Sequence, residues 1–156
     1  MIEVGRSSDA QLMRELFREY QAGVNAPVCF ASFDVELAAL PAPYAAILIA
    51  HVDGSAAGCV ALKPLTDEIG EVKRLYVRPA FRQLGLGERL MRGAADEARR
   101  LGYTKVRLDT LPFMARAIGL YQRLGYVPID RYNDNPEPQA HLIRSRRHIS
   151  SNSISN

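Results

Sequence analysis

The sequence has few of the features that mark a secreted, metal-binding or membrane-spanning protein. It contains two cysteines and three histidines, and neither set has the spacing of a metal site. We expect Cys29 and Cys59 to be reduced thiols in the core. No apolar run reaches the roughly 18 residues that a membrane span needs. The start, Met1-Ile2-Glu3-Val4, lacks the basic and apolar regions of a signal peptide, so we expect a cytoplasmic protein without metal or membrane contact.

A surplus of positive charge is also missing once the C-terminal end is set aside. The net charge is +3 and the pI is near 9.0. Residues 144–156 hold three of the 20 basic residues and no acid, so the rest of the chain has 17 basic against 17 acidic residues. Because a nucleic-acid-binding face needs clustered basic residues, we expect no nucleic-acid partner. We predict that the Ser- and Asn-rich residues 144–156 form a disordered tail.

The chain does contain enough apolar residues for one core. With 156 residues, of which 47% are hydrophobic and 24% charged, it has the composition of a single globular domain, which we assign to residues 1–143. The pattern predicts the order strand, helix, helix, strand, strand, strand, helix, strand, helix, strand, with Ala140–Ile143 as a last short strand. This order predicts an α/β fold whose sheet is mostly antiparallel at its start.

Local signals fix the predicted ranges of most elements. Ser8-Asp9-Ala10-Gln11 has capping-box spacing at a helix start, and Asp53-Gly54 is a hairpin turn. The predicted strands are Met1–Gly5, Tyr44–Val52, Ser55–Leu62, Glu71–Val77 and Lys105–Thr110, and a short helix is predicted at Phe33–Leu40.

The most informative segment lies between the strand Glu71–Val77 and the helix that starts near Leu86. Pro79 cannot extend a ladder, and the helix ends at Gly102, which favours a left-handed stop. Its apolar face consists of Leu86, Leu90, Ala94, Ala98 and Leu101. The first helical amides have no partner inside the helix, and the glycines Gly85 and Gly87 let a ligand approach the backbone. The segment therefore predicts a site for the phosphates of a cofactor.

Two common phosphate loops are excluded by the same segment. A Rossmann turn needs a third glycine where this chain has Leu90, and a Walker loop needs Gly-Lys-Ser/Thr, which the chain lacks. A helix that happens to begin with glycines is the alternative interpretation.

The pattern Arg82-x-x-Gly85-x-Gly87 resembles the acyl-CoA motif of the GNAT superfamily of N-acetyltransferases. The segment Leu120-Tyr121-Gln122-Arg123-Leu124-Gly125-Tyr126 resembles the second signature of that superfamily, an aromatic-bearing helix that ends in Leu-Gly-Tyr. Pro112 suits the first turn of this helix and Gly125 the position after its end. The resemblance covers residues 71–132.

The resemblance implies a fold, an activity and a co-substrate. The fold would be a mixed, mostly antiparallel sheet with splayed central strands and helices on both faces. The activity would be transfer of an acetyl group from acetyl-CoA to a primary amine of a small molecule or peptide, and a homodimer is left open. The implied cofactor-binding residues are Leu75, Tyr76, Val77, Arg82, Gln83, Leu84, Gly85, Leu86, Gly87 and Glu88, and a free strand edge is a natural partner for the pantetheine arm.

The resemblance also implies catalytic residues. Tyr121 matches the family tyrosine that donates a proton to the leaving sulfur, and its alternative role is a core aromatic next to Ala117 and Leu124. The backbone amide of Val77 is the implied oxyanion donor. The position of Tyr121 in the motif favours the catalytic role.

Two carboxylates are candidates for the general base. Glu71 and Asp109 match positions where family members carry a catalytic glutamate. The alternative role of each carboxylate is a surface salt bridge, and a water chain is the alternative to a carboxylate base. Period-two alternation puts Glu71, Lys73, Leu75 and Val77 on one face. Lys73 would then favour the ionised form of Glu71, which weakens it as a base.

One position departs from the family pattern. Met114 stands where many members have an asparagine that helps to hold the cofactor arm. A non-catalytic acyl-CoA-binding sensor on the same fold is therefore the alternative function. The acceptor site is expected around Cys29–Leu40 and the polar segment Tyr132–Pro136.

Overall fold

Seven strands form one sheet in the computed structural model, which describes residues 1–23, 33–110, 115–129 and 140–145. The strand order is β1-β2-β3-β4-β5-β7-β6, and all neighbours are antiparallel except β4 and β5. The strands are β1 (Ile2–Arg6), β2 (Ala46–Val52), β3 (Ser55–Pro64), β4 (Ile69–Val77), β5 (Lys105–Thr110), β6 (Val127–Ile129) and β7 (Ala140–Ser145).

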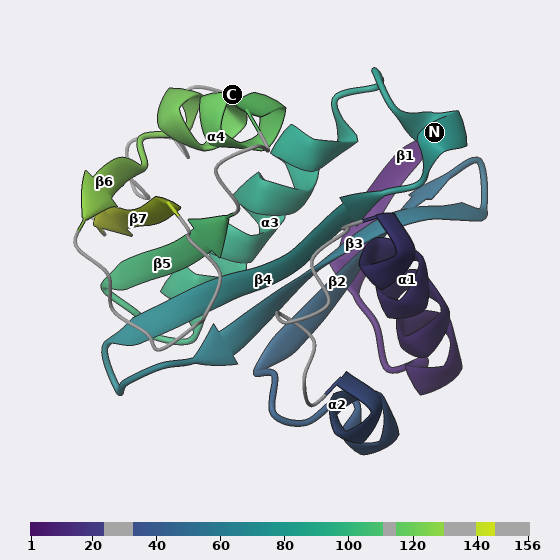
Figure 1. Cartoon of the computed structure of the whole chain (residues 1–156), viewed down its shortest axis with the longest axis horizontal. Helices are drawn as coiled ribbons and strands as arrows, with labels where there is room; N and C mark the ends of the chain where they lie inside the picture. The colour runs from purple at the N-terminus through teal and green to yellow at the C-terminus, as the bar shows by residue number, and fades with distance from the viewer. Residues whose placement is uncertain (24–32, 111–114, 130–139, 146–156) are drawn as a thin grey trace.

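Helices cover both faces of this sheet (Figure 1). They are α1 (Ala10–Gly23), α2 (Phe33–Ala39), α3 (Leu86–Arg100) and α4 (Ala115–Arg123). The α3 face is the side on which α3 and α4 pack, with buried Leu90, Ala94 and Tyr121; the α1 face is the side of α1 and α2, with buried Phe17 and Leu37. No helix in the described segments is long and apolar enough to cross a bilayer.

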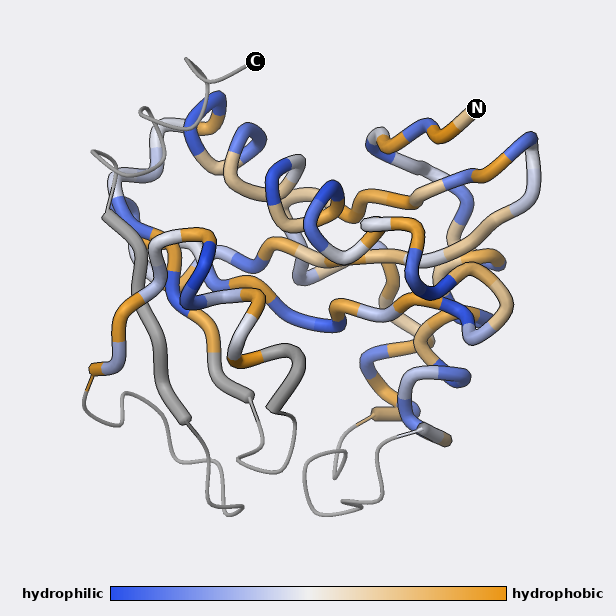
Figure 2. Tube along the Cα trace, turned by 90° about the horizontal axis from the view of Figure 1, so that it is seen from above, coloured by the Kyte–Doolittle hydropathy of each residue, from blue (hydrophilic) through white to orange (hydrophobic). Residues whose placement is uncertain are grey.

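Burial follows the alternation of the strands. Figure 2 shows hydrophobic residues along the middle strands and hydrophilic residues on the outer turns of the helices. In β3, Val60 packs on the α3 face, whereas its neighbours Cys59 and Ala61 pack on the α1 face. Strand β3 is therefore buried on both faces and lies at the centre of the molecule, between the two helical layers.

The predicted fold class is confirmed, including the splay of the central strands. Pairing of β4 with β5 runs only from Ile69↔Lys105 to Val72↔Leu108. On its β3 side, β4 stays paired as far as Val77. Within the described residues, no strand pairs with Lys73–Val77 on the β5 side.

Several predicted boundaries are confirmed by the backbone. Gly102, with φ +90°, follows α3, and the Asp53-Gly54 turn joins β2 and β3 with φ of +49° and +85°. Gly125, with φ +92°, follows α4, whereas Pro112 lies outside the described residues. The N-terminus of α1 differs in detail, because Asp9 rather than Ser8 accepts the hydrogen bond from a helical amide, that of Leu12 at 3.1 Å.

The last strand is longer than predicted. β7 continues through Arg144 and Ser145, which pair with Val106 and Lys105 of β5. The first two residues of the predicted tail 144–156 are therefore part of the sheet. Pairing with β5 accounts for the extension, because β6 pairs only with His141–Ile143.

The predicted alternation along β4 is wrong at one point, where the strand contains a β-bulge. Tyr76 pairs with Cys59 but Lys73 pairs with Ala61, so β4 has one extra residue, and Arg74 has a left-handed φ of +60°. Leu75 and Val77 consequently pack on the α3 face. Glu71 and Lys73, which were predicted to share their face, lie on the α1 face.

Gly58 of β3 lies against the part of β4 that follows the bulge. A Cβ built on Gly58 would collide with the carbonyl oxygen of Tyr76 and would lie 3.2 Å from Cα of Val77. We expect Gly58→Ala to lower the free energy of unfolding by about 1–3 kcal/mol, since backbone must move to make room. Gly5→Ala is the control, because a Cβ on Gly5 of β1 has no atom within 4 Å. Equal effects of the two substitutions in urea denaturation would contradict the close approach.

Candidate functional site

A short loop after β4 leads into the N-terminus of α3. It consists of a 3-10 turn at Pro79–Phe81 and the exposed residues Arg82, Gln83, Leu84 and Gly85, of which Gln83 and Gly85 have φ of +71° and +74°. Gly85 is the N-cap of α3 and has no side chain that could cap the helix. The first hydrogen bond into the helix runs from the Arg89 amide to the Gly85 carbonyl, at 3.2 Å.

This geometry leaves the amides of Leu86, Gly87 and Glu88 at the positive end of the helix dipole. Leu86 is buried beneath the turn, whereas Gly87 and Glu88 are half-buried. The Glu88 carboxylate is paired with Arg92 at 2.8 Å, so Glu88 contributes its amide to the turn rather than a free charge. Such a turn can bind an anionic group through backbone amides.

Arg82 connects this loop to the end of β4. Its Nε donates a hydrogen bond of 3.1 Å to the carbonyl oxygen of Val77. The loop is thereby held against the last residue of the strand.

The end of β4 presents polar backbone groups on the side where β5 has diverged. The Arg78 amide donates to the Ala57 carbonyl of β3 at 2.8 Å, and the Tyr76 carbonyl also faces β3, beside Gly58. Backbone groups alternate along a strand, so those of Leu75 and Val77 point to the opposite side. We call Leu75 and Val77 the open edge; Tyr76 lies between them but directs its side chain to the α1 face.

Tyr121 lies on α4, close to the same loop. It is 7% exposed, and its ring centroid is 6.0 Å from that of Tyr126. The preceding residue, Leu120, comes within 3.4 Å of where a Cβ of Gly87 would lie, so α4 packs on the start of α3. Tyr121, the open edge and Leu86 therefore belong to one apolar cluster on the α3 face.

The predicted base Glu71 is on the opposite side of the sheet. It is 4% exposed, and its Oε1 is 3.6 Å from Nζ of Lys73, which confirms the predicted ion pair but places it in the interior rather than at the surface. Asp109 is in β5, opposite His141 of β7, and its side chain lies outside the described part of the chain. The structure thus separates Glu71 from Tyr121 by the sheet itself.

The remaining predicted positions are resolved only in part. Cys59 is buried, its thiol donates to the Arg74 carbonyl at 3.4 Å, and burial raises its pKa to about 12, as suits a core thiol. Cys29, Met114 and Tyr132–Pro136 lie outside the described residues.

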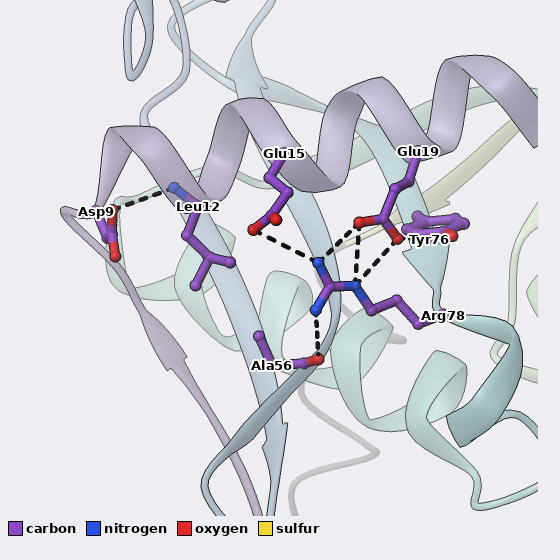
Figure 3. Close-up of polar contacts among 7 residues, drawn as sticks. All are labelled: Asp9, Leu12, Glu15, Glu19, Ala56, Tyr76 and Arg78. Atoms are coloured by element: carbon purple, nitrogen blue, oxygen red, sulfur yellow. Dashed lines mark hydrogen bonds and ion pairs between the residues drawn. The ribbon is translucent and has the colours of Figure 1, made fainter.

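An ion-pair network that the sequence did not predict links α1 to the end of β4 (Figure 3). Nη2 of Arg78 is 2.7 Å from Oε2 of Glu19, and Nε donates to Oε1 at 3.0 Å. The Tyr76 hydroxyl donates to the same carboxylate at 3.2 Å, and Glu15 lies 3.6 Å from Arg78. Hydrogen bonding by Arg78 lowers the pKa of Glu19.

A second unpredicted ion pair holds the bulge. Arg74 makes two hydrogen bonds to Glu36 of α2, from Nη2 to Oε1 at 2.8 Å and from Nε to Oε2 at 3.1 Å. Its guanidinium lies over the rings of Phe33 and Tyr20, at 5.4 and 5.8 Å from their centroids. Burial is the largest single effect and lowers the pKa of Arg74, but the hydrogen bonds to Glu36 and the electrostatic attraction of Tyr44, Glu36 and Tyr20 together raise it.

Comparison with known proteins points to one family. The model of the acetyltransferase (GNAT) family matches residues 10–126. An uncharacterized N-acetyltransferase of Schizosaccharomyces pombe is 34% identical over 142 residues, which cover 87% of each chain.

Solved structures share the fold. One from Klebsiella pneumoniae, described as an acyl-CoA N-acyltransferase, has a TM-score of 0.74 and 26% identity, with 93% of this chain and 96% of that chain covered. The yncA structure from Salmonella typhimurium, which contains acetyl-CoA, has a TM-score of 0.74 and 19% identity, with 93% of this chain and 94% of that chain covered.

The ion pair of Glu19 predicts a pH-dependent contribution to stability. The folded-state pKa of Glu19 lies below its ordinary value of 4.5, so the stabilisation is present above that value and is lost as the pH falls through the folded-state pKa. We expect Glu19→Gln to lower the free energy of unfolding by roughly 0.5–1 kcal/mol at neutral pH, because the carboxylate is partly exposed. In urea denaturation, a deficit equally large after acidification to where Glu19 is protonated would contradict this account.

Proposed function

Because the chain belongs to the acetyltransferase (GNAT) family, a family of acetyl-CoA-dependent N-acetyltransferases, we propose that it transfers the acetyl group of acetyl-CoA to a primary amine of a small molecule or peptide. The observation that carries this proposal is the convergence of three features on the α3 face. These are the uncapped N-terminus of α3, the open edge of β4 and the buried Tyr121 of α4.

The residues present fit two polar parts of acetyl-CoA, its diphosphate and its pantetheine arm. The amides from Gly85 to Glu88 would hold its diphosphate, and the absence of a side chain at Gly87 lets the backbone come close. The backbone groups of Leu75 would bind an amide group of the pantetheine arm as a neighbouring strand would, which leaves the Val77 amide for the acetyl carbonyl. Arg82, bound to the Val77 carbonyl, would keep these two subsites in register.

Acetyl transfer then needs a donor for the developing oxyanion and a proton for the departing sulfur. The Val77 amide, on the open edge, would stabilise the oxyanion. The Tyr121 hydroxyl would protonate the thiolate. A thiol is a stronger acid than a phenol, but the hydrogen bond from the tyrosine strengthens as negative charge builds on the leaving sulfur. Acetyl-CoA supplies the activated acyl group, and the protein supplies position and protons.

The acceptor amine would approach from the α1 face. Glu71 is buried on that face, so it could take a proton from the amine while Tyr121 acts from the other side of the sheet. Nζ of Lys73 lies 3.6 Å from Oε1 of this carboxylate, so the acceptor amine would meet Glu71 beside a lysine. Asp109 and a water chain remain the alternative routes for this proton.

The test is thiol release from acetyl-CoA in the presence of a panel of primary amines, with Tyr121→Phe as the variant. Removing one hydroxyl should lower kcat by roughly 10²–10⁴-fold, because the proton donor is lost while the ring still packs. Calorimetry should show acetyl-CoA affinity close to that of the wild type. Tyr103→Phe is a matched control on the α3 face, since Tyr103 also packs on the apolar cluster but lies at the far end of α3.

Two results would change the assignment. Full turnover by Tyr121→Phe would leave Tyr121 as a packing residue. Acetyl-CoA binding without thiol release for any amine would favour the non-catalytic acyl-CoA sensor instead.

A further inference from the structure

Two ion pairs from the α1 face bracket the open edge of β4. Arg74 comes immediately before Leu75 and is held by Glu36 of α2; Arg78 comes immediately after Val77 and is held by Glu19 of α1. Both arginines use two nitrogens on one carboxylate, a geometry that fixes direction as well as distance. The open edge is therefore fixed at both ends by helices that lie on the other side of the sheet.

The Arg74 pair has a specific backbone conformation to maintain. A non-glycine residue at φ +60° carries a cost of about 1–2 kcal/mol relative to right-handed backbone, and it persists only when its surroundings hold it. Here the surroundings are the Glu36 carboxylate, the rings of Phe33 and Tyr20, and the Cys59 thiol on the Arg74 carbonyl. Together they hold the one residue that turns Leu75 and Val77 toward the α3 face.

The element that supplies Glu36 is itself fixed. α2 buries Phe33 and Leu37 in the apolar cluster of the α1 face, and Arg14 of α1 donates a hydrogen bond of 2.9 Å to the Leu37 carbonyl. The Glu36 side chain is 17% exposed, so its pair with Arg74 is shielded from solvent and strongly directional. A displacement of α2 would thus be transmitted to the bulge.

We propose that Glu36 is a positioning residue for acetyl transfer, which acts by locking Arg74 in the bulge of β4 and so aiming the Val77 amide at the reacting carbonyl. This role rests on the proposed function, because it takes Val77 as the oxyanion donor. It also couples the acceptor side of the sheet to the oxyanion donor, since α2 and Glu36 lie on the α1 face.

The first test compares Glu36→Gln with Glu97→Gln. Glu97 of α3 is a matched control, because its side chain is also 17% exposed and is paired with an arginine, Arg100 at 2.6 Å, but it lies far along α3 from the loop. We expect Glu36→Gln to lower kcat by roughly 10–100-fold with the Kd for acetyl-CoA within about twofold of wild type, since only alignment is lost. Glu97→Gln should change neither. Equal kcat values for the two variants, or a parallel loss of acetyl-CoA affinity in Glu36→Gln, would overturn the proposal.

The second test separates the effect of the backbone conformation at the bulge from the effect of losing the contact between Arg74 and α2. Arg74→Ala and Arg74→Gly both remove the guanidinium, but only glycine adopts φ +60° without steric cost. We expect Arg74→Gly to keep a kcat several-fold above that of Arg74→Ala, although glycine is the more flexible residue. If Arg74→Ala is as active as Arg74→Gly, the left-handed backbone of the bulge does not matter for turnover, and the proposed role of Glu36 is wrong.

A third measurement keeps the proposal separate from the proposed function. Backbone amide chemical shifts of Leu75 and Val77 should change in Glu36→Gln and not in Glu97→Gln, whether or not an acceptor has been found. Unchanged shifts in Glu36→Gln would overturn the positioning role. Absence of thiol release by the wild-type protein with every amine would instead refute the proposed function, and the shifts would still report on the bulge.

Discussion

The short pairing between β4 and β5 is the constraint on which the candidate site depends. Hydrogen bonding between these strands stops at Val72↔Leu108, although β4 continues to Val77. Where a strand continues past the end of its neighbour, its N–H and C=O groups on that side have no partner in the neighbouring strand. A ligand with peptide-like amides can then form these hydrogen bonds. In this protein that strand end runs directly into the loop that begins α3, so one continuous stretch of backbone contains both the open edge and the candidate anion site.

The bulge at Arg74 determines how this stretch is used. Without the extra residue, Leu75 and Val77 would point to the α1 face and the alternation of β4 would continue from Glu71. With it, Glu71 lies on the α1 face and the side chains of Leu75 and Val77 pack on the α3 face near Tyr121. In the proposed mechanism the two faces of the sheet therefore have different roles: Glu71 and the acceptor amine would lie on the α1 face, and the sulfur of acetyl-CoA on the α3 face.

Much of this could be predicted from local sequence signals. Glycine and proline mark the end of β4 and both ends of α3, and period-two and period-3.6 patterns gave β4, α3 and β5 within two residues of their observed bounds. These signals come from neighbours in the chain, so a local pattern is sufficient to detect them.

The features that were missed depend on distant partners. Glu36 is 38 residues from Arg74, and Glu19 is 59 residues from Arg78, so neither pair leaves a local pattern. The bulge was missed for the same reason, because an arginine in left-handed backbone has no sequence signature and persists through tertiary contacts. Strand β7 was predicted too short, since Arg144 looked like part of a basic tail while its pairing with β5 decides its conformation.

Titration of the isotope-labelled protein with acetyl-CoA, followed through backbone amide chemical shifts, tests the central claim most directly. The account predicts the largest shift changes at Leu75 and Val77 of the open edge and from Gly85 to Glu88 at the start of α3, with little change along β1 and β2. Saturable binding that leaves the amides of the open edge and of the α3 N-terminus unshifted would contradict it.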